Sequence, residues 1–355
     1  MWIKEIELKN FRNYKEEKIS LKNNVNILYG ENAQGKTNII ESIFLCSMGK
    51  SFRTTKDKEM IKINERNCSV EVEYEKSDRE GQIKIEIGNK KNIFINGIKI
   101  KKLSELLGKI NVVIFTPDDI EIIKGGPEKR RKFLDIMISQ LRPNYMYILS
   151  LYQKTLEQRN NYLKQIKEEK KDENLLEIWD NKLCEYAIKI HEYREEFINK
   201  LIPKIEKIHN EITNNKEKIK IEYMTECKKK ETYLNLLKQR RKLDIIKGFT
   251  TKGIHRDDFM IYVNGKQINV YGSQGQQRTA ILTLKLAELN VIHDEIGEYP
   301  ILLLDDFMSE LDKNRRESLI KNIKNNQVII TCTEKIPLEN FEYLEYNVKE
   351  GKIIN

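Results

Sequence analysis

The sequence lacks the features that mark membrane, secreted and disulfide-bonded proteins. None of its apolar runs approaches the roughly 20 residues that a membrane-spanning helix needs. The first seven residues, MWIKEIE, carry charge where a signal peptide has its apolar segment. No C-x-x-C pair is present, because the cysteines stand singly as Cys46, Cys68, Cys184, Cys227 and Cys332. We therefore expect a soluble cytoplasmic protein with reduced thiols, no structural zinc site and no membrane attachment.

Charge, by contrast, is abundant. The 355 residues include 64 Lys and Arg against 55 Asp and Glu, which gives a net charge of +9. An excess of basic residues favours a polyanionic partner such as nucleic acid. Alternatively, a genome rich in A and T raises the lysine content of its proteins without any link to DNA binding. The charge alone therefore leaves nucleic-acid binding open.

Glycine is missing between Gly126 and Gly248, and this gap separates two kinds of sequence. Residues 1–115 show the period-two alternation of half-buried strands, and strand signals return after the gap. Between them, apolar residues recur at the three- and four-residue spacing of amphipathic helices. We expect one α/β domain formed by residues 1–115 and 248–355, with a compact helical lobe at 116–247 inserted into it.

Individual elements can be predicted from the same patterns. Asn-Gly pairs at 96–97 and 264–265, flanked by β-branched residues, predict two tight hairpins. Pro143 and Pro203 predict the starts or breaks of helices. A helix is expected over 276–292. Strands are expected around residues 3–8, 19–21, 25–29, 70–74, 83–87, 260–263, 268–271, 301–304 and 328–330.

The sharpest motif is GENAQGKT at residues 30–37, which matches the phosphate-loop pattern G-x-x-x-x-G-K-[ST]. A predicted buried strand precedes it and an apolar helix follows, as such a loop requires. Its backbone amides and the helix N-terminus would hold the β- and γ-phosphates. Lys36 would bridge these phosphates, and the Thr37 hydroxyl would ligate Mg²⁺. The motif therefore predicts a site for ATP and Mg²⁺.

A second motif supplies the acids that such a site needs. Residues 301–306, ILLLDD, read as a buried strand that ends in two carboxylates. We expect Asp305 to hold Mg²⁺, directly or through water, and Asp306 to polarise the attacking water. The alternative is an ordinary strand end with two exposed acids.

The third motif, GSQGQQR at residues 272–278, lies at the start of the predicted helix. It resembles the signature of ABC-type ATPases, in which Ser and Gly of one subunit cap the γ-phosphate bound by the other. Simple N-capping by Ser273 is the alternative. SELD at 309–312 is similar to the D-loop of that superfamily. VIITCT at 328–333 has Thr331 and Thr333 where a switch histidine is often found.

These motifs together resemble the RecF family, and Gln274 in the signature is the form which that family uses. The resemblance covers residues 1 to about 335 in the family's order. It is carried by NFRNY at 10–14, GENAQGKT at 30–37, KSFRT at 50–54, FTPDD at 115–119, KGGP at 124–127, RRKFLD at 130–135, GIHRDD at 253–258 and YGSQGQQR at 271–278.

The resemblance implies an ABC-type ATPase head, with a mixed central sheet and an antiparallel β subdomain, related to SMC proteins but without long coiled coils. It implies DNA binding (double-stranded or at gap junctions, with single strands also open), an ATP-dependent homodimer and weak, DNA-dependent ATP hydrolysis. RecR and RecO are the implied partners, in loading RecA at gaps during repair and replication restart. An ATPase subunit of another complex, for transport or chromosome organisation, and a scaffold that binds ATP without turnover remain alternatives.

The expected site draws on all of these segments. Arg12 and Arg53 are expected to contact phosphate or to lie in solvent. His255 is either a base or a structural group. The basic runs 129–132 and 228–230 either touch DNA or form solvated helix faces. The catalytic set is Asp306, Lys36 and, from a second copy, Ser273; the metal set is Thr37 and Asp305; the nucleotide set is Arg12, Gly30, Glu31, Asn32, Ala33, Gln34, Gly35, Lys36, Thr37, Ser273, Gly275 and Gln276.

Overall fold

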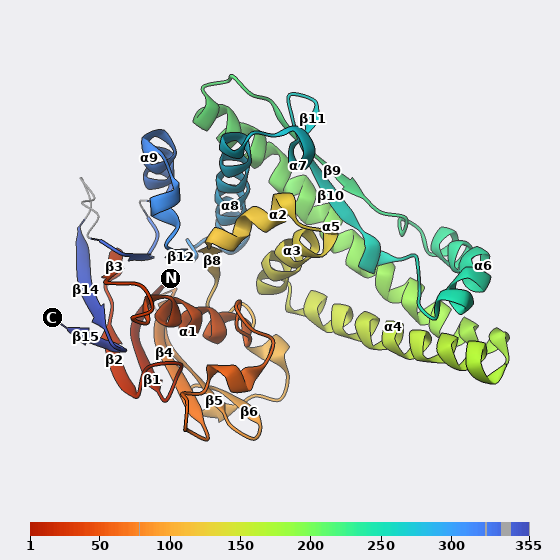
Figure 1. Ribbon diagram of the computed structural model, residues 1–355, viewed down its shortest axis with the longest axis horizontal. Coiled ribbons are helices and arrows are strands. Elements are labelled where there is room, and N and C mark those ends of the chain that lie inside the picture. The colour runs from red at the N-terminus through yellow and green to blue at the C-terminus, as the bar shows by residue number, and fades with distance from the viewer. Residues whose placement is uncertain (78, 324, 335–341, 355) are drawn as a thin grey trace. The chain divides into compact units, whose positions relative to one another are not determined.

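The computed structural model describes residues 1–77, 79–323, 325–334 and 342–354 (Figure 1). Its residues group into two compact units. The first unit contains residues 1–120, 208–215 and 278–355, and the second contains 121–207 and 216–277. Within the described ranges, no helix is both long enough and apolar enough to cross a membrane.

A six-stranded mixed sheet forms the centre of the first unit, in the order β15-β14-β3-β13-β12-β8. All neighbours are parallel except β15, which runs antiparallel to β14. Strands β3, β8, β12 and β13 are buried almost throughout, as expected for parallel strands covered on both faces. The strands are β3 (Val25–Tyr29), β8 (Val112–Phe115), β12 (Ile301–Asp305), β13 (Val328–Cys332), β14 (Tyr343–Lys349) and β15 (Lys352–Ile354).

A second, antiparallel sheet completes the first unit, in the order β2-β1-β4-β5-β6-β7. Buried and exposed residues alternate along β4, so one face of the sheet packs on the core. Asn96 and Gly97 have φ values of 50° and 77°, which confirms the first predicted tight hairpin. The strands are β1 (Trp2–Lys9), β2 (Glu16–Ser20), β4 (Cys68–Lys76), β5 (Arg79–Ile87), β6 (Lys91–Ile95) and β7 (Ile98–Lys99).

Helix α1 (Lys36–Met48) packs on β4 and β5 of the antiparallel sheet and on β8, β12 and β13 of the mixed sheet. It begins after Gly35 and ends at Gly49, which has the left-handed conformation of a glycine C-cap. All of its residues except Thr37 and Asn38 are buried. This helix is therefore the core that both sheets share.

The second unit is built from helices and one small sheet. Strands β9 (Ile219–Met224), β10 (Asp258–Val263) and β11 (Lys266–Gln267) pair in the order β11-β10-β9. The helices are α2 (Glu121–Lys124), α3 (Pro127–Leu141), α4 (Pro143–Glu169), α5 (Leu176–Thr213), α6 (Lys230–Lys247) and α7 (Ile268–Tyr271). Helix α8 (Gln274–Ile296) continues into the first unit, which also holds α9 (Lys313–Asn322).

The mixed central sheet and the antiparallel subdomain agree with the predicted fold class, but the units have different boundaries from the expected domains. Residues 248–277 group with the helical unit because β10 pairs with β9 along six residues of each strand. The sequence patterns did not indicate β9, which lies inside the segment expected to be helical. Residues 208–215, at the end of α5, group with the first unit, where His209 Nδ1 lies 3.2 Å from the Thr283 hydroxyl.

Two local predictions were wrong. Residues 268–271 form helix α7 and not a strand, because the pairing of β11 with β10 stops at Gln267 and the chain then turns, burying only Ile268 of these four residues. Pro143 begins α4 as predicted, whereas Pro203 lies inside α5. The helix continues through this proline because a buried apolar stripe runs along both sides of it, which offsets the lost hydrogen bond. The stripe comprises Phe197, Ile198, Leu201, Ile205 and Ile208.

A buried ionic cluster ties three helices of the second unit together. The Arg159 guanidinium, on α4, donates through Nε to Asp180 Oδ1 of α5 at 2.6 Å and through Nη1 to Asp244 Oδ2 of α6 at 2.8 Å. All three side chains are fully buried. The Thr250 hydroxyl accepts a further bond from Nη1. Removing one member of such a cluster leaves uncompensated buried charge.

We therefore expect Arg159→Leu to lower the free energy of unfolding by about 3–5 kcal/mol, since buried Asp244 loses its cation and buried Asp180 is left with Arg241 at 3.5 Å. Arg240→Leu, at an exposed position of α6, is the matched control and should change it by less than about 0.5 kcal/mol. Urea unfolding followed by circular dichroism measures both. Equal midpoints for the two variants would contradict the prediction.

Candidate nucleotide-binding site

The phosphate loop connects β3 to α1, as predicted, and its glycines have tight surroundings. Gly30 has a φ of 148°, and a Cβ there would lie 2.4 Å from the Val348 carbonyl oxygen. Gly35 has a φ of 116°, and a Cβ there would lie 2.7 Å from the Asn13 side-chain amide. Ala33 between them is left-handed, with a φ of 65°. The loop therefore has a strained, closely packed path that only glycine permits at its two ends.

Lys36 lies back along this loop. Its Nζ donates to the carbonyl oxygens of Gly30 and Glu31 at 2.5 and 2.7 Å. Burial lowers the pKa of Lys36, and the charges of Asp306 and Asp305 act in the opposite direction. The ammonium group is thus held by the backbone of the loop that it follows, close to two carboxylates.

Strand order brings the predicted acids to the loop. Because β13 lies between β3 and β12 and all three are parallel, their carboxyl ends share one edge of the sheet. The Thr37 and Thr331 hydroxyls donate to Asp305 Oδ1, at 2.8 and 2.9 Å. Burial raises the pKa of Asp305, and these hydroxyl bonds oppose the rise. The structure thus brings together the predicted pair Thr37 and Asp305.

The donor set of this pair suits Mg²⁺. A hydroxyl and a carboxylate are hard oxygen ligands, and Mg²⁺ is usually held by one or two protein groups together with substrate phosphates and water. In the described part of the chain, no group of three or more His, Cys, Asp and Glu residues could form a metal site by itself. The phosphates of a nucleotide would therefore have to supply the remaining ligands.

Asp306 follows Asp305 and has a left-handed backbone, with a φ of 52°. Its amide N–H donates to the Thr331 hydroxyl at 2.9 Å. Thr331 therefore contacts both acids from the position expected for a switch histidine, while Thr333 is exposed. A non-glycine residue in this conformation at the end of a central strand is the kind of local strain that functional sites retain.

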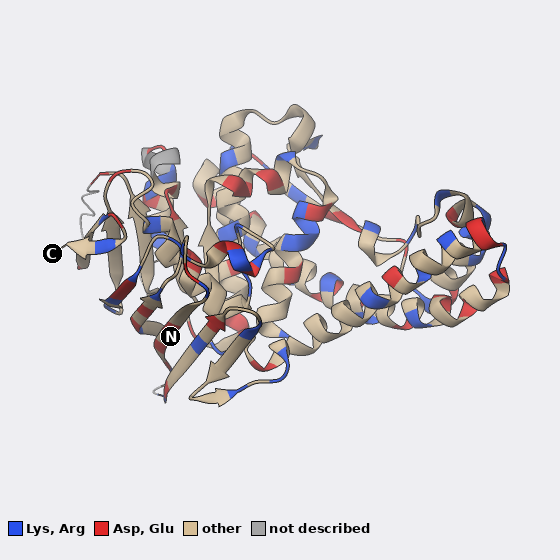
Figure 2. Ribbon diagram, turned by 60° about the horizontal axis from the view of Figure 1, so that its bottom comes forward, with Lys and Arg blue, Asp and Glu red and all other residues tan. Residues whose placement is uncertain are grey.

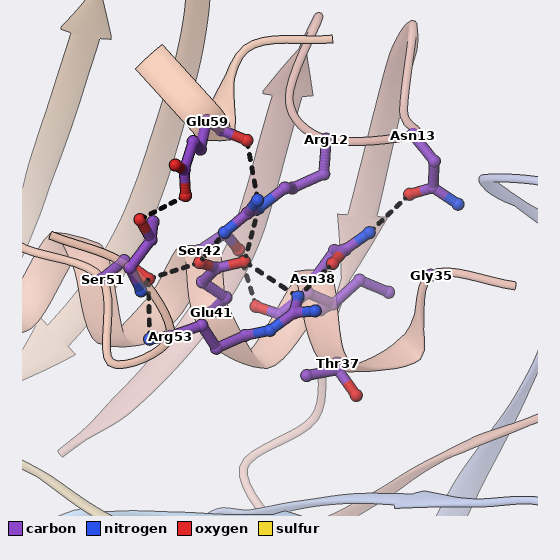
Figure 3. A network of polar contacts seen from close by, with 12 residues as sticks. Arg12, Asn13, Gly35, Thr37, Asn38, Glu41, Ser42, Ser51, Arg53 and Glu59 are labelled. Atoms are coloured by element: carbon purple, nitrogen blue, oxygen red, sulfur yellow. Dashed lines mark hydrogen bonds and ion pairs between the residues drawn. The ribbon is translucent and has the colours of Figure 1, made fainter. Parts of the chain in front are cut away.

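Arg12 is anchored on a carboxylate that sequence patterns did not identify (Figure 3). Its Nε and Nη2 donate to the two oxygens of Glu41 at 2.9 and 2.6 Å, and its Nη1 donates to the Glu59 carbonyl at 2.7 Å. Glu41 lies on α1 and is fully buried. Arg53 reaches the same carboxylate at 3.2 Å, and the Ser51 hydroxyl also donates to it. One buried carboxylate thus forms ion pairs with two arginines.

A chain of amide contacts continues from this acid to the phosphate loop. Arg53 Nη1 donates to Asn38 Oδ1 at 2.8 Å, and Asn38 Nδ2 donates to Asn13 Oδ1 at 2.7 Å. Asn13 Nδ2 then donates to the Gln34 carbonyl at 2.8 Å. The only sequence signal for Glu41 was an acid within the apolar run that follows Thr37. An isolated acid in a buried helix requires a cation, and the sequence does not show where that cation lies.

Residues 272–277 of the signature belong to the second unit. The amide of Gln276 donates to the Ser273 hydroxyl at 3.2 Å, and the Ser273 amide donates to the Gln276 side-chain oxygen at 3.0 Å. This reciprocal pair is a capping box at the start of α8. Gln276 Nε2 also donates to Glu217 at 2.9 Å. Ser273 is nevertheless exposed, and Gly275 follows it in the first turn of the helix.

Several basic residues considered for DNA contact have internal partners. Arg130 is buried and makes a two-point ion pair with Asp258, at 2.6 and 2.9 Å. Arg131 donates to the Asp257 carbonyl at 2.6 Å. The motifs at 130–135 and 253–258 are therefore joined to each other within the second unit. Lys129 and Lys132 of the first run, and all of 228–230, are exposed.

His255 has the contacts of a structural group. Its Nε2 lies 3.1 Å from the Thr250 carbonyl, which only accepts, so Nε2 carries the proton. Its Nδ1 lies 2.7 Å from the Tyr152 hydroxyl and accepts from it. Burial lowers the pKa of His255 to about 4. The neutral imidazole is thus bound on both nitrogens.

The fold and the site define the class of protein. A family model described as RecF/RecN/SMC N terminal domain matches residues 2–352. The Smc head domain of Pyrococcus furiosus, 16% identical, superposes with a TM-score of 0.57 over 99% of this chain and 96% of that chain, a likeness of fold alone. The molecule is an ABC-type ATPase head of the kind found in RecF and SMC proteins.

Closer relatives narrow the class to one family. The DNA replication and repair proteins RecF of Acetivibrio thermocellus and Clostridium tetani are each 46% identical, covering 96% and 100% of this chain and 95% and 98% of their own lengths. A solved structure of the recombination mediator protein RecF with ATP, in the RecFOR pathway, is 43% identical. It superposes with a TM-score of 0.93 over 99% of this chain and 97% of that chain. The chain belongs to the RecF family.

The buried acid of Figure 3 leads to a stability prediction. Glu41→Gln keeps the shape of the side chain but leaves Arg12 and Arg53 without their shared anion, so we expect a loss of about 3 kcal/mol of unfolding free energy. Glu59→Gln is the control, because Arg12 uses only the backbone carbonyl of that residue. It should cost less than about 0.5 kcal/mol. Chemical denaturation measures both, and a neutral Glu41→Gln would show that the two arginines do not depend on it.

His255 predicts a pH dependence. Between pH 6.5 and about 4 the unfolded chain protonates this histidine while the folded chain keeps it neutral, so lowering the pH favours unfolding. We expect a loss of about 2 kcal/mol from this residue between pH 7.5 and pH 5. The free energy of unfolding of His255→Gln should therefore fall by about 2 kcal/mol less than that of the wild type over the same pH interval. Parallel stability curves for the two proteins would contradict the assignment.

Proposed function

We propose that this protein is an ATP-dependent DNA-binding protein of recombinational repair and replication restart, acting in the cytoplasm. The observation that carries the proposal is the contact of Thr37 with Asp305 beside Lys36, at the edge where the phosphate loop begins. The relatives named above are DNA replication and repair proteins, and a solved one is bound to ATP. Its place in the RecFOR pathway supports RecR and RecO as partners, in loading RecA at gaps.

The phosphate loop would bind ATP through residues 30–37. Its backbone amides and the N-terminus of α1 favour negative charge at the β- and γ-phosphates. Lys36 would exchange its carbonyl contacts with Gly30 and Glu31 for these phosphates, which satisfy its charge better. Thr37 and Asp305 would hold Mg²⁺, which neutralises the phosphate oxygens in this chemistry. Arg12, held by Glu41, would contribute a positive charge near the loop.

Hydrolysis would depend on Asp306 and on a second copy of the chain. Asp306 would orient the attacking water and accept its proton. Ser273 and the amide of Gly275 from the partner copy would cap the γ-phosphate, so that an isolated chain turns over slowly. Val270 and Tyr271, just before Ser273, are 62% and 70% exposed. Apolar side chains exposed next to the signature support its burial in an ATP-dependent homodimer.

DNA would be held by the dimer and released after hydrolysis. The net charge is +9, but Figure 2 shows basic and acidic residues interspersed along the helices of the second unit. Because Arg130 and Arg131 have internal partners, the exposed lysines at 228–230 are the better candidates for backbone contacts. We propose that ATP turnover is weak and that DNA stimulates it.

The test measures double-stranded DNA binding with ATP, ADP or no nucleotide at two salt concentrations, while light scattering follows the mass. We expect dimers that hold DNA only with ATP. Lys36→Arg should lose this state, and Ser273→Arg should abolish the dimer. Ser150→Arg, an exposed serine on α4, controls for the added charge and should behave as wild type. Asp306→Asn should slow hydrolysis roughly 100-fold and prolong DNA binding.

Two results would contradict the proposal. DNA binding that is indifferent to nucleotide and to all three site variants would leave a basic protein with an unrelated ATPase. Failure to bind DNA in every nucleotide state would instead favour an ATPase subunit of a transport complex.

A further inference from the structure

The turn of the C-terminal hairpin, between β14 and β15, hydrogen-bonds to Gln34 of the phosphate loop. The Glu350 amide donates to the Gln34 side-chain oxygen at 2.6 Å, and the Gly351 amide donates to the Gln34 carbonyl at 3.0 Å. Both amides belong to the turn between the two strands, more than 300 residues along the chain from the loop. Both polar groups with which Gln34 can accept a hydrogen bond thus have a partner in this turn.

The hairpin also limits the loop at its other end. Strand β14 runs parallel to β3. A Cβ at Gly30 would lie only 2.4 Å from the Val348 carbonyl oxygen of β14. The hairpin therefore requires glycine at position 30, independently of any contact that Gly30 makes with a phosphate. One continuous piece of chain thus contacts the loop at both Gly30 and Gln34, while residues 31–33 between them are exposed.

Asn13 also contacts Gln34. Its side-chain amide donates to the same Gln34 carbonyl at 2.8 Å, so that carbonyl accepts from Asn13 and from Gly351. Asn13 and Gly351 also touch each other, because a Cβ at Gly351 would lie 2.8 Å from the Asn13 carbonyl oxygen. A shift of the turn would therefore be transmitted to both bonds of the Gln34 carbonyl.

The hairpin is itself firmly attached. The Tyr346 hydroxyl donates to the Ser20 carbonyl at 2.6 Å, and the Ile353 amide donates to the Glu17 carboxylate. Both partners lie on β2, in the other sheet of the first unit. The turn is thus held by two sheets and can serve as a fixed reference for the loop.

We propose that the turn at Glu350 and Gly351 is a positioning element for ATP binding: it holds Gln34 so that the phosphate loop is preorganised for phosphate. Gln34 follows Ala33, whose φ of 65° is unfavourable for a non-glycine residue in an unsupported chain. Contacts that hold such a conformation before the ligand arrives raise affinity, because less order is lost on binding. This inference rests on the proposed function, since it takes ATP as the ligand of the loop.

Two turn glycines provide a matched pair for the test. Gly351 and Gly265 have φ values of 71° and 74°, so alanine suffers the same backbone strain at both positions. A Cβ at Gly351 meets Asn13, whereas a Cβ at Gly265, between β10 and β11, has no heavy atom within 4 Å. Titration with a fluorescent ATP analogue should show the Kd raised roughly fivefold or more in Gly351→Ala, as expected for weakened hydrogen bonds. In Gly265→Ala it should stay within about twofold.

A double-mutant cycle separates positioning from general destabilisation. Gln34→Ala should raise the Kd for the analogue by a similar factor. Alanine at position 34 removes the acceptor of the Glu350 amide but keeps the carbonyl that accepts from Gly351. If the turn acts through Gln34, the double variant Gln34→Ala, Gly351→Ala should therefore lose less binding free energy than the sum of the two single losses. Fully additive losses would overturn the proposal, as would an unchanged Kd in a folded Gly351→Ala protein. If Gly351→Ala fails to fold, an unchanged Kd in Gln34→Ala alone overturns it.

The same titration tests the underlying function independently. Lys36→Ala should abolish binding of the analogue if the loop is the ATP site. Binding by wild type that Lys36→Ala does not alter would overturn the proposed function, and the positioning role with it. Loss in Lys36→Ala with equal affinity of Gly351→Ala and Gly265→Ala would overturn only the role of the hairpin.

Discussion

The burial of helix α1 between two sheets is the constraint from which the site follows. A helix packed on both sides cannot leave polar groups to solvent, so each one needs a partner within the fold. Glu41 accepts hydrogen bonds from Arg12 of the antiparallel subdomain and from Arg53 of the loop after the helix. Lys36 donates to the loop backbone, and Thr37 donates to Asp305 of the mixed sheet. The same contacts that satisfy the helix therefore align the groups on which nucleotide binding would depend.

The parallel strands set the chemistry at the other side of the loop. With β13 between β3 and β12, Thr331 comes into register with Asp305 and its hydroxyl contacts both consecutive acids. A histidine is thus not needed to connect these strand ends. The C-terminal hairpin closes the loop from the opposite side through Gln34. The phosphate loop is consequently fixed by a segment near the beginning of the chain and by segments between residues 305 and 351.

Not every motif that marks the family serves the nucleotide. The arginines at 130 and 131 and the motif at 253–258 are joined by ion pairs and backbone hydrogen bonds inside the second unit, where His255 is neutral and bound on both sides. Buried ion pairs of this kind are strongly destabilising when one partner is removed, which gives them a structural role. The motifs at 130–135 and 253–258 therefore have a structural role, whereas the motif at 30–37 forms the candidate nucleotide site.

The sequence by itself determined the local chemistry: the phosphate loop, the acidic strand end, the capped signature helix and most strands, because each is written in contiguous residues with a fixed period or spacing. It also determined the family. Tertiary structure alone decided that Glu41 unites Arg12 with Arg53, that β9 joins the second unit through β10, and that residues 268–271 form a helix after the pairing with β10 stops at Gln267. It alone placed the C-terminal turn on Gln34. These outcomes depend on contacts between residues far apart in the chain, and the local periodicity of the sequence does not indicate such contacts.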